Sequence, residues 1–143
     1  MSERKGLSMD NSTSIVRVLV VDDFERWRRY LCATMREIPE IQVVGEAADG
    51  LEAIQKMETV RPDLVLLDIG LPQLNGIEVA RRLRRISPEC QIIFFSENRS
   101  LDVREEAFRA GGMAYVVKSE SPSELITAIN TVLRRKNVRA QES

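Results

Sequence analysis

Five residues whose side chains carry oxygen or nitrogen stand directly after short apolar runs of the sequence. Each of four such runs is followed by one or two of them: Asp22 and Asp23, Asp68, Ser96, and Lys118. Three carboxylates within a few ångströms of one another repel strongly and call for a cation. Ligands that are all oxygen favour a hard ion that keeps several waters and binds phosphate, which describes Mg²⁺. If the runs are neighbouring strands, these residues predict a magnesium site with a hydroxyl and an ammonium beside it.

Each of these residues also has an interpretation that involves no chemistry. Asp23 could cap a helix that starts at the next residue, and Asp22 could be a solvated loop acid. Asp68 lies just before a Gly-Leu-Pro turn, where aspartate commonly accepts backbone N–H bonds. Ser96 could be a turn hydroxyl and Lys118 a surface charge. Their joint occurrence at the ends of four runs favours a shared site.

The apolar runs alternate with helix-like segments, and this alternation sets the expected fold class. The runs are short and rich in β-branched or aromatic residues, as strands covered on both faces are: 16–21, 41–46, 63–67, 91–95 and 114–117. Five strands that alternate with five helices predict an α/β fold with one parallel sheet and helices on both faces. The carboxyl ends of parallel strands meet at one edge of the sheet, where ligands bind.

The helical segments show which side they bury and where they begin. The first has a single apolar stripe: Phe24, Trp27, Leu31, Met35 and Ile38. Trp27 is therefore expected in the core, where its replacement by alanine would cost roughly 3–5 kcal/mol. Capping boxes predict three helix starts: Asp49 with Glu52, Asn75 with Glu78, and Ser121 with Glu124. The pair Gly111-Gly112 predicts the end of the fourth helix.

Composition excludes several classes of chemistry. The 143 residues include no histidine, which rules out a Ser-His-Asp triad, a His-paired thiol nucleophile, an HExxH metal site and a phosphohistidine carrier. A net charge of −1 gives no general attraction to nucleic acid or to an anionic membrane. Cys32 and Cys90 lie in apolar runs, which predicts buried free thiols in a reducing cytoplasm. No apolar run approaches the ~18 residues of a membrane span.

The two ends of the chain differ from its middle. Residues 1–14 and 136–143 are polar and aperiodic, so we expect flexible tails there and a single domain at 15–135. Four arginines between residues 81 and 85 flank an apolar helix pattern, and a solvated helix face accounts for them better than a docking patch.

Four segments resemble the receiver domain of bacterial two-component response regulators. They are VLVVDDF at 18–24, LVLLDIGLPQLNGIE at 64–78, FFSEN at 94–98 and AYVVKS at 114–119. LPQLNGIE and YVVKS are most similar to receivers that precede a LuxR/NarL-type DNA-binding helix-turn-helix. The resemblance covers residues 15–135 and implies a flavodoxin-like fold with strand order 2-1-3-4-5. It also implies a role in phosphorelay signal transduction.

The resemblance assigns the acidic residues to phosphoryl transfer. Asp68 would be the phosphoacceptor for a sensor histidine kinase or a phosphotransfer protein. Asp22 and Asp23 would hold Mg²⁺ together with Asp68 and the backbone carbonyl of Gly70. The protein would be a phosphoprotein and not an enzyme in the usual sense, because it would catalyse only its own phosphorylation and slow dephosphorylation.

The remaining roles concern the switch. Ser96 would bond the phosphoryl group, Lys118 would pair with another of its oxygens, and Tyr115 would be the aromatic whose rotamer follows Ser96. The output surface would then lie in residues 97–135 and bind an output protein or domain. The resemblance further implies a homodimer of the phosphorylated form, with no nucleic acid or membrane bound by these residues.

The chain departs from the family at two positions, and rival functions remain. The family usually has proline where this chain has Ser119, and often a small residue where it has Glu97. The chain could also be the receiver half of a longer DNA-binding transcriptional regulator. An aspartate-based phosphatase of the haloacid-dehalogenase type uses similar groups. That class requires a DxD motif, whereas Asp68 is followed by Ile69 and Gly70.

Overall fold

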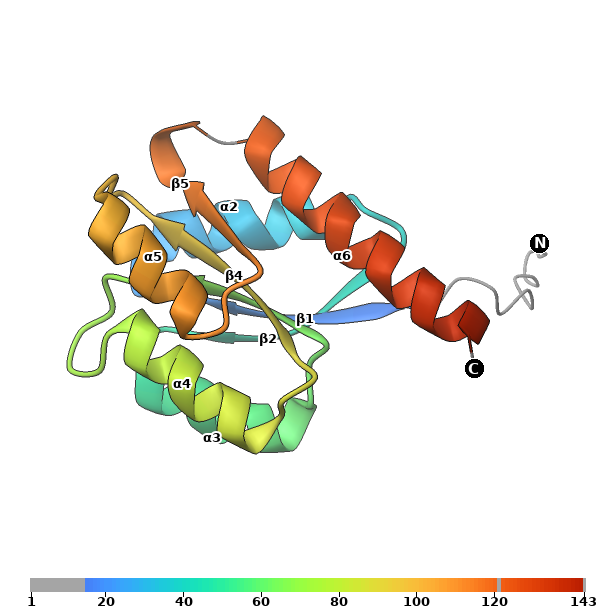
Figure 1. Ribbon diagram of the computed structural model, residues 1–143, viewed down its shortest axis with the longest axis horizontal. Coiled ribbons are helices and arrows are strands. Elements are labelled where there is room, and N and C mark those ends of the chain that lie inside the picture. Colours follow the sequence, from blue (N-terminus) through green and yellow to red (C-terminus); the bar gives the residue numbers. More distant parts are fainter. Residues whose placement is uncertain (1–14, 121, 143) are drawn as a thin grey trace.

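A computed structural model of the chain describes residues 15–120 and 122–142. Five parallel strands form one sheet in the order β2-β1-β3-β4-β5 within these residues (Figure 1). The strands are β1 (Val16–Val21), β2 (Ile41–Ala47), β3 (Leu64–Asp68), β4 (Gln91–Ser96) and β5 (Ala114–Val117). The fold is therefore the flavodoxin-like α/β arrangement that was predicted, and each strand begins and ends within one residue of its predicted range.

Helices cover both faces of the sheet. They are α2 (Glu25–Arg36), α3 (Gly50–Val60), α4 (Gly76–Ile86), α5 (Leu101–Arg109) and α6 (Ser123–Glu142), and a 3₁₀ turn, η2 (Lys118–Glu120), follows β5. In Figure 1, α3 and α4 lie below the sheet, while α2 and α6 lie above it. Within the described residues, no helix is both long enough and apolar enough to span a membrane.

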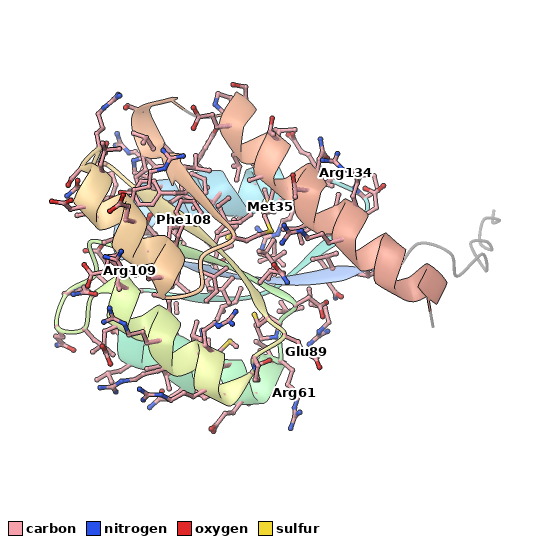
Figure 2. The ribbon with its side chains drawn as sticks, in the orientation of Figure 1. Met35, Arg61, Glu89, Phe108, Arg109 and Arg134 are labelled. Atoms are coloured by element: carbon pink, nitrogen blue, oxygen red, sulfur yellow. The ribbon has the colours of Figure 1, made fainter. Side chains whose placement is uncertain are left out.

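Two apolar layers hold the helices to the sheet, because the strands bury both of their faces. One layer joins the sheet to α3, α4 and α5 and includes Met57 and Leu83. The other joins it to α2 and α6 and includes Met35, labelled in Figure 2, and Ile129. Every residue of β3 is buried, which explains the continuous apolar run in its sequence.

The first helical stripe is only partly buried, which corrects one prediction. Leu31 and Met35 are buried as expected, but Trp27 is half-buried and Phe24 is 53% exposed. The reason is position along the helix axis. The start of α2 lies beside the carboxyl end of the sheet, close to Lys118, so its first apolar residues do not lie over the strands.

Helix ends agree with the capping signals where the structure describes them. Asp49 accepts a hydrogen bond from Glu52 N at 2.8 Å, and Asn75 accepts one from Glu78 N at 3.0 Å. Ser121, predicted to cap the last helix, lies outside the described residues. Gly111 has a φ of 109° just after α5, which supplies the predicted left-handed helix end.

The last helix is longer than predicted. It continues through residues 136–142, which the sequence analysis assigned to a tail, whereas the predicted tail at 1–14 lies outside the described residues. The extension contains neither glycine nor proline, so no helix-breaking residue interrupts it. Cys32 and Cys90 are both free and buried, which confirms that part of the prediction about the two thiols.

Candidate functional site

All five predicted site residues lie at the carboxyl edge of the sheet. Asp22 and Asp23 follow β1, Asp68 ends β3, Ser96 ends β4 and Lys118 directly follows β5. Strand register brings them level, because Val21 pairs with Leu67, Asp68 with Phe95, and Ser96 with Val117. The edge strand β2 contributes none of these groups.

The site gathers the buried polar side chains of the domain. Among the described residues, the buried polar or charged residues are Asp22, Asp68, Ser96 and Lys118, with whole-residue exposures of 0%, 6%, 4% and 6%. Lys118 Nζ lies 2.8 Å from Asp22 Oδ2 and 3.6 Å from Asp68 Oδ1. Burying a charge is costly unless it is paired, so this grouping is not explained by stability alone.

Local hydrogen bonds fix the two buried carboxylates from their own loops. Asp22 Oδ1 accepts from Phe24 N at 2.8 Å, and Asp68 Oδ1 accepts from Gly70 N at 3.1 Å. The N-cap of α2 is Phe24, and no side chain caps that end. Asp23 therefore does not cap α2, and it stands exposed at the rim of the site.

The positive charge in the site does not balance the negative charge of its carboxylates. Burial, together with the negative charges of Asp22 and Asp23, raises the pKa of the Asp68 carboxyl to about 6, although Lys118 and the Gly70 N–H act in the opposite direction. Three carboxylates and one ammonium leave a formal charge of −2 when all are ionised. A divalent cation would balance that charge.

The donor set fits a magnesium ion. Asp22, Asp23 and Asp68 each offer a carboxylate oxygen, and these oxygens all lie within 4.8 Å of one another. Asp22 Oδ2 is fully buried yet accepts no hydrogen bond, because Lys118 Nζ approaches it as a charge and not in hydrogen-bond geometry. An oxygen with an unused lone pair in an all-oxygen cluster is what a hard cation requires. The Gly70 peptide borders the same cluster.

Ser96 and Tyr115 meet at the loop that follows β4. Ser96 Oγ accepts from Asn98 N at 2.9 Å, so the serine does form the turn that its sequence position also allowed. The Tyr115 hydroxyl donates to the Asn98 carbonyl at 2.7 Å, and Tyr115 is 6% exposed. Tyr115 is thus linked through the backbone of Asn98 to the turn that Ser96 forms.

The two departures from the family pattern take defined places. Ser119 lies in η2 and its Oγ accepts from the Arg99 guanidinium at 2.8 Å, which joins the loops after β4 and β5. Glu97 is exposed, in the loop that follows β4.

Two residues lie near the site although the sequence patterns did not predict this for them. The Arg28 guanidinium donates to the Asp22 carbonyl at 2.8 Å and pairs with Glu46 at 3.1 Å, which ties α2 to the end of β1. Trp27 places its ring 5.4 Å from Lys118 Nζ. Trp27 lies one helical turn after the Asp22-Asp23 pair, and this spacing was the available signal of a place near the site. The periodicity of apolar residues alone predicted that Trp27 lies in the core.

Comparison with known proteins identifies a family over most of the chain. The model of the response regulator receiver domain matches residues 18–130. The chain is 35% identical to the chemotaxis protein CheY of Thermotoga maritima, covering 81% of this chain and 96% of that protein. It is 37% identical to the DNA-binding transcriptional activator DevR/DosR of Mycobacterium tuberculosis, covering 82% of this chain and 54% of that protein.

Solved structures agree with the sequence comparisons. A LuxR-family two-component response regulator from Aurantimonas superposes with a TM-score of 0.80 at 35% identity, covering 85% of this chain and 86% of that one. The signal receiver domain of the response regulator NarL of Mycobacterium tuberculosis gives 0.78 at 26% identity, covering 85% and 98%. The chain spans nearly all of CheY but about half of the curated transcriptional regulators PdtaR and DevR/DosR. With the acidic cluster at the sheet edge, these matches establish that the chain belongs to the receiver domain family of two-component response regulators.

Proposed function

We propose that the domain accepts a phosphoryl group on Asp68 from a sensor histidine kinase or a phosphotransfer protein, in a reaction that requires Mg²⁺. The observation that carries this proposal is the position of Asp68 at the end of a central strand. There its carboxylate borders two further carboxylates and lies 3.6 Å from the Lys118 ammonium. The Asp68 side chain is 8% exposed, so one edge of its carboxylate is open to a phosphoryl donor.

The chemistry that we propose is a direct displacement at phosphorus. An oxygen of the Asp68 carboxylate attacks phosphorus, while the bond to the donor's imidazole nitrogen breaks and its electron pair leaves with the imidazole. Such a transition state needs positioning and charge neutralisation more than bond-making by the protein. Lys118 would pair with one phosphoryl oxygen, and the Ser96 hydroxyl would turn to donate to another.

The metal ligands in this proposal are the carboxylates of Asp22, Asp23 and Asp68 with the backbone carbonyl of Gly70. Bound there, Mg²⁺ would supply the positive charge that the phosphoryl oxygens need. The unused lone pair of Asp22 Oδ2 and the formal charge of −2 support this assignment.

The proposed reaction is a signalling step and not turnover of a substrate. The domain would promote its own phosphorylation and a slow loss of the phosphoryl group, and nothing more. Free buried thiols at Cys32 and Cys90 suit a reducing compartment, so we place the reaction in the cytoplasm.

The decisive experiment is phosphorylation by acetyl phosphate, a small donor that needs no protein partner. Wild-type protein with Mg²⁺ should gain one phosphoryl group per chain by intact-mass spectrometry, and chelation of Mg²⁺ should prevent this. Asp68→Asn should remain unlabelled. Asp49→Asn is the matched control, because asparagine caps α3 as well as aspartate does and the residue lies outside the acidic cluster.

Persistent labelling of Asp68→Asn would contradict the proposal, and so would labelling of the wild type that does not depend on Mg²⁺. Steady turnover of p-nitrophenyl phosphate would instead favour a phosphatase. A phosphoryl group that accumulates to one per chain and is lost slowly is the expected result.

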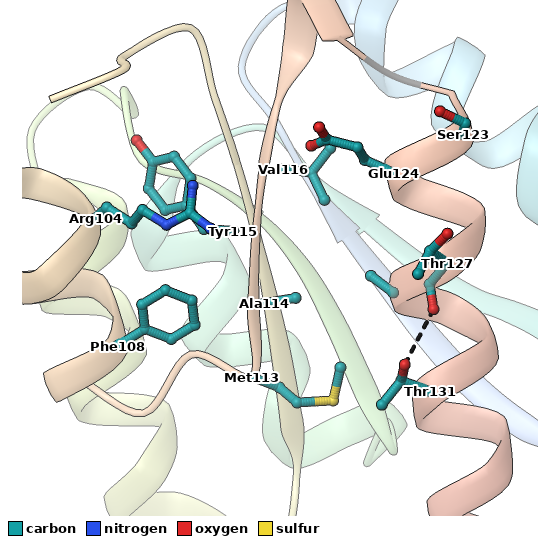
Figure 3. A pocket seen from close by; sticks show the side chains of 11 residues that line it. Arg104, Phe108, Met113, Ala114, Tyr115, Val116, Ser123, Glu124, Thr127 and Thr131 are labelled. Carbon is teal, nitrogen blue, oxygen red and sulfur yellow. Dashed lines mark hydrogen bonds between the residues drawn. The ribbon is translucent and has the colours of Figure 1, made fainter. Parts of the chain in front are cut away.

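The output surface in this proposal runs along α5, β5 and α6. A cavity of about 410 Å³ opens there, between Arg104 and Phe108 of α5 and Glu124 and Thr127 of α6 (Figure 3). Tyr115 lines it and also bonds the loop after Ser96. A movement of Ser96 toward a phosphoryl group would therefore reach this surface through Tyr115.

The partner at this surface would be an output protein, an output domain of a longer chain, or a second phosphorylated copy. The name of DevR/DosR, a DNA-binding transcriptional activator, supports the second of these, because this chain matches about half of that protein's length. The domain itself would then be the receiver half of a longer DNA-binding transcriptional regulator.

A further inference from the structure

Lys118 has an aromatic neighbour in addition to its two carboxylates. Its Nζ lies 5.4 Å from the centroid of the Trp27 ring, within the ~6 Å at which an ammonium is attracted to an aromatic face. Lys118 is 6% exposed, so little water reaches this charge. An aromatic face attracts a cation more strongly when water is excluded.

The indole is held in place from two directions. Its ring meets the Tyr30 ring edge-on, with centroids 5.3 Å apart and planes at 86°. The next residue, Arg28, bonds the Asp22 carbonyl and Glu46, which ties the first turn of α2 to the acidic cluster. The position of the ring is therefore coupled to the carboxylates that Lys118 contacts.

We infer that Trp27 is a positioning residue that holds the Lys118 ammonium between Asp22 and Asp68, where a phosphoryl oxygen would arrive. A lysine has a flexible four-carbon stem, and the 2.8 Å contact shows its preference for Asp22. The indole faces the ammonium from a third direction, so it limits the places that Nζ can occupy. This inference rests on the proposed phosphorylation of Asp68.

A purely structural role makes a different prediction. If Trp27 only filled space, a large aliphatic residue would replace it about as well as another aromatic one. If its π face holds the ammonium, phenylalanine should preserve function while leucine, of comparable apolar character, should not. Trp27→Phe and Trp27→Leu are therefore matched variants at one position.

The first measurement is the initial rate of Mg²⁺-dependent labelling by acetyl phosphate, followed by intact mass. Trp27→Phe should stay within about threefold of wild type, and Trp27→Leu should be about 3- to 30-fold slower. Thermal unfolding of both variants, followed by circular dichroism, selects a temperature at which each is fully folded. Equal rates for the two variants would overturn the inference.

The second measurement does not depend on phosphorylation. In wild-type protein, the ring current should shift the Cε proton signals of Lys118 upfield, and Trp27→Leu should return them toward the position of a free lysine. Unshifted signals in the folded wild type would overturn the contact itself. If acetyl phosphate fails to label wild type while the shift is present, the proposed function fails and the Trp27–Lys118 contact stands.

Discussion

At the scale of single residues, Asp68 carries an energetic cost that depends on pH. Burial raises its pKa from 3.8 to about 6, so between these values the folded state binds more protons than the unfolded state. Stability from this group is therefore fully present below about pH 4 and is lost as pH rises through about 6. Above that, folding buries a carboxylate beside Asp22 at a net cost.

This cost predicts that Asp68→Asn stabilises the metal-free protein at neutral pH. We expect a gain of about 1–2 kcal/mol in the free energy of unfolding at pH 7.5 and almost none near pH 4. Urea unfolding of both proteins at several pH values measures the difference. Saturating Mg²⁺ should reduce the gain, since the metal would stabilise the wild type more. A gain that is equal at both pH values would contradict the raised pKa.

At the scale of elements, the connection between β3 and α4 is built too tightly for a side chain at Gly76. A Cβ placed there would lie 2.2 Å from the Asp68 carbonyl oxygen and 2.7 Å from Ile69 Cα. The Gly76 N–H also donates to the Ile69 carbonyl at 2.9 Å, which closes the loop. The start of α4 thus sets the position of the backbone that carries Asp68.

Gly76→Ala should therefore destabilise the domain and weaken Mg²⁺ binding, although alanine favours helices more than glycine does. We expect a loss of about 1–3 kcal/mol, because backbone must move to admit the methyl group. Gly70→Ala is the control for stability, since its Cβ would meet nothing closer than 3.9 Å. Thermal unfolding and a Mg²⁺ titration measure the two effects. A Gly76→Ala protein as stable as wild type would show that the loop can relax.

At the scale of the whole molecule, strands β4 and β5 connect the site to the proposed output surface. Ser96 and Lys118 follow residues that pair across these strands, and Tyr115 lies between them and α5. The Arg104 guanidinium stacks over the Tyr115 ring at 5.7 Å and over Phe108 at 5.8 Å. A shift of Tyr115 would therefore disturb α5 as well as the loop.

Beryllofluoride, a phosphoryl mimic, should reveal this path without a phosphodonor. In the presence of Mg²⁺, backbone amide signals should move in the loop after Ser96, in α5 and in β5, and Tyr115→Phe should reduce the shifts in α5. Switches of this kind usually couple two sites by ~1–3 kcal/mol. Changes confined to the loops around Asp22 and Asp68, with residues 97–118 unchanged, would contradict the proposed output surface.

The architecture and the identity of the central residues could be predicted from local patterns. Continuous apolar runs occur where a strand is covered on both faces, and the residues that follow such runs must stand at the sheet edge. This logic located Asp22, Asp68, Ser96 and Lys118 correctly at that edge. Capping side chains predicted the starts of α3 and α4 for the same reason, since a cap bonds backbone within three residues.

The sequence by itself determined the strands, the sheet class and which side chains stand at the sheet edge, because each of these depends on neighbours in the chain. Tertiary structure alone decided what Trp27 contacts. The periodicity of apolar residues shows which side of α2 faces the sheet. It does not show how far the helix extends past the strand ends, or that Lys118, which follows the edge strand β5, reaches Trp27. The bond from Tyr115 to Asn98 and the ion pair between Lys118 and Asp22 are of the same kind. They join segments that are distant in sequence, and packing rather than local preference sets their geometry.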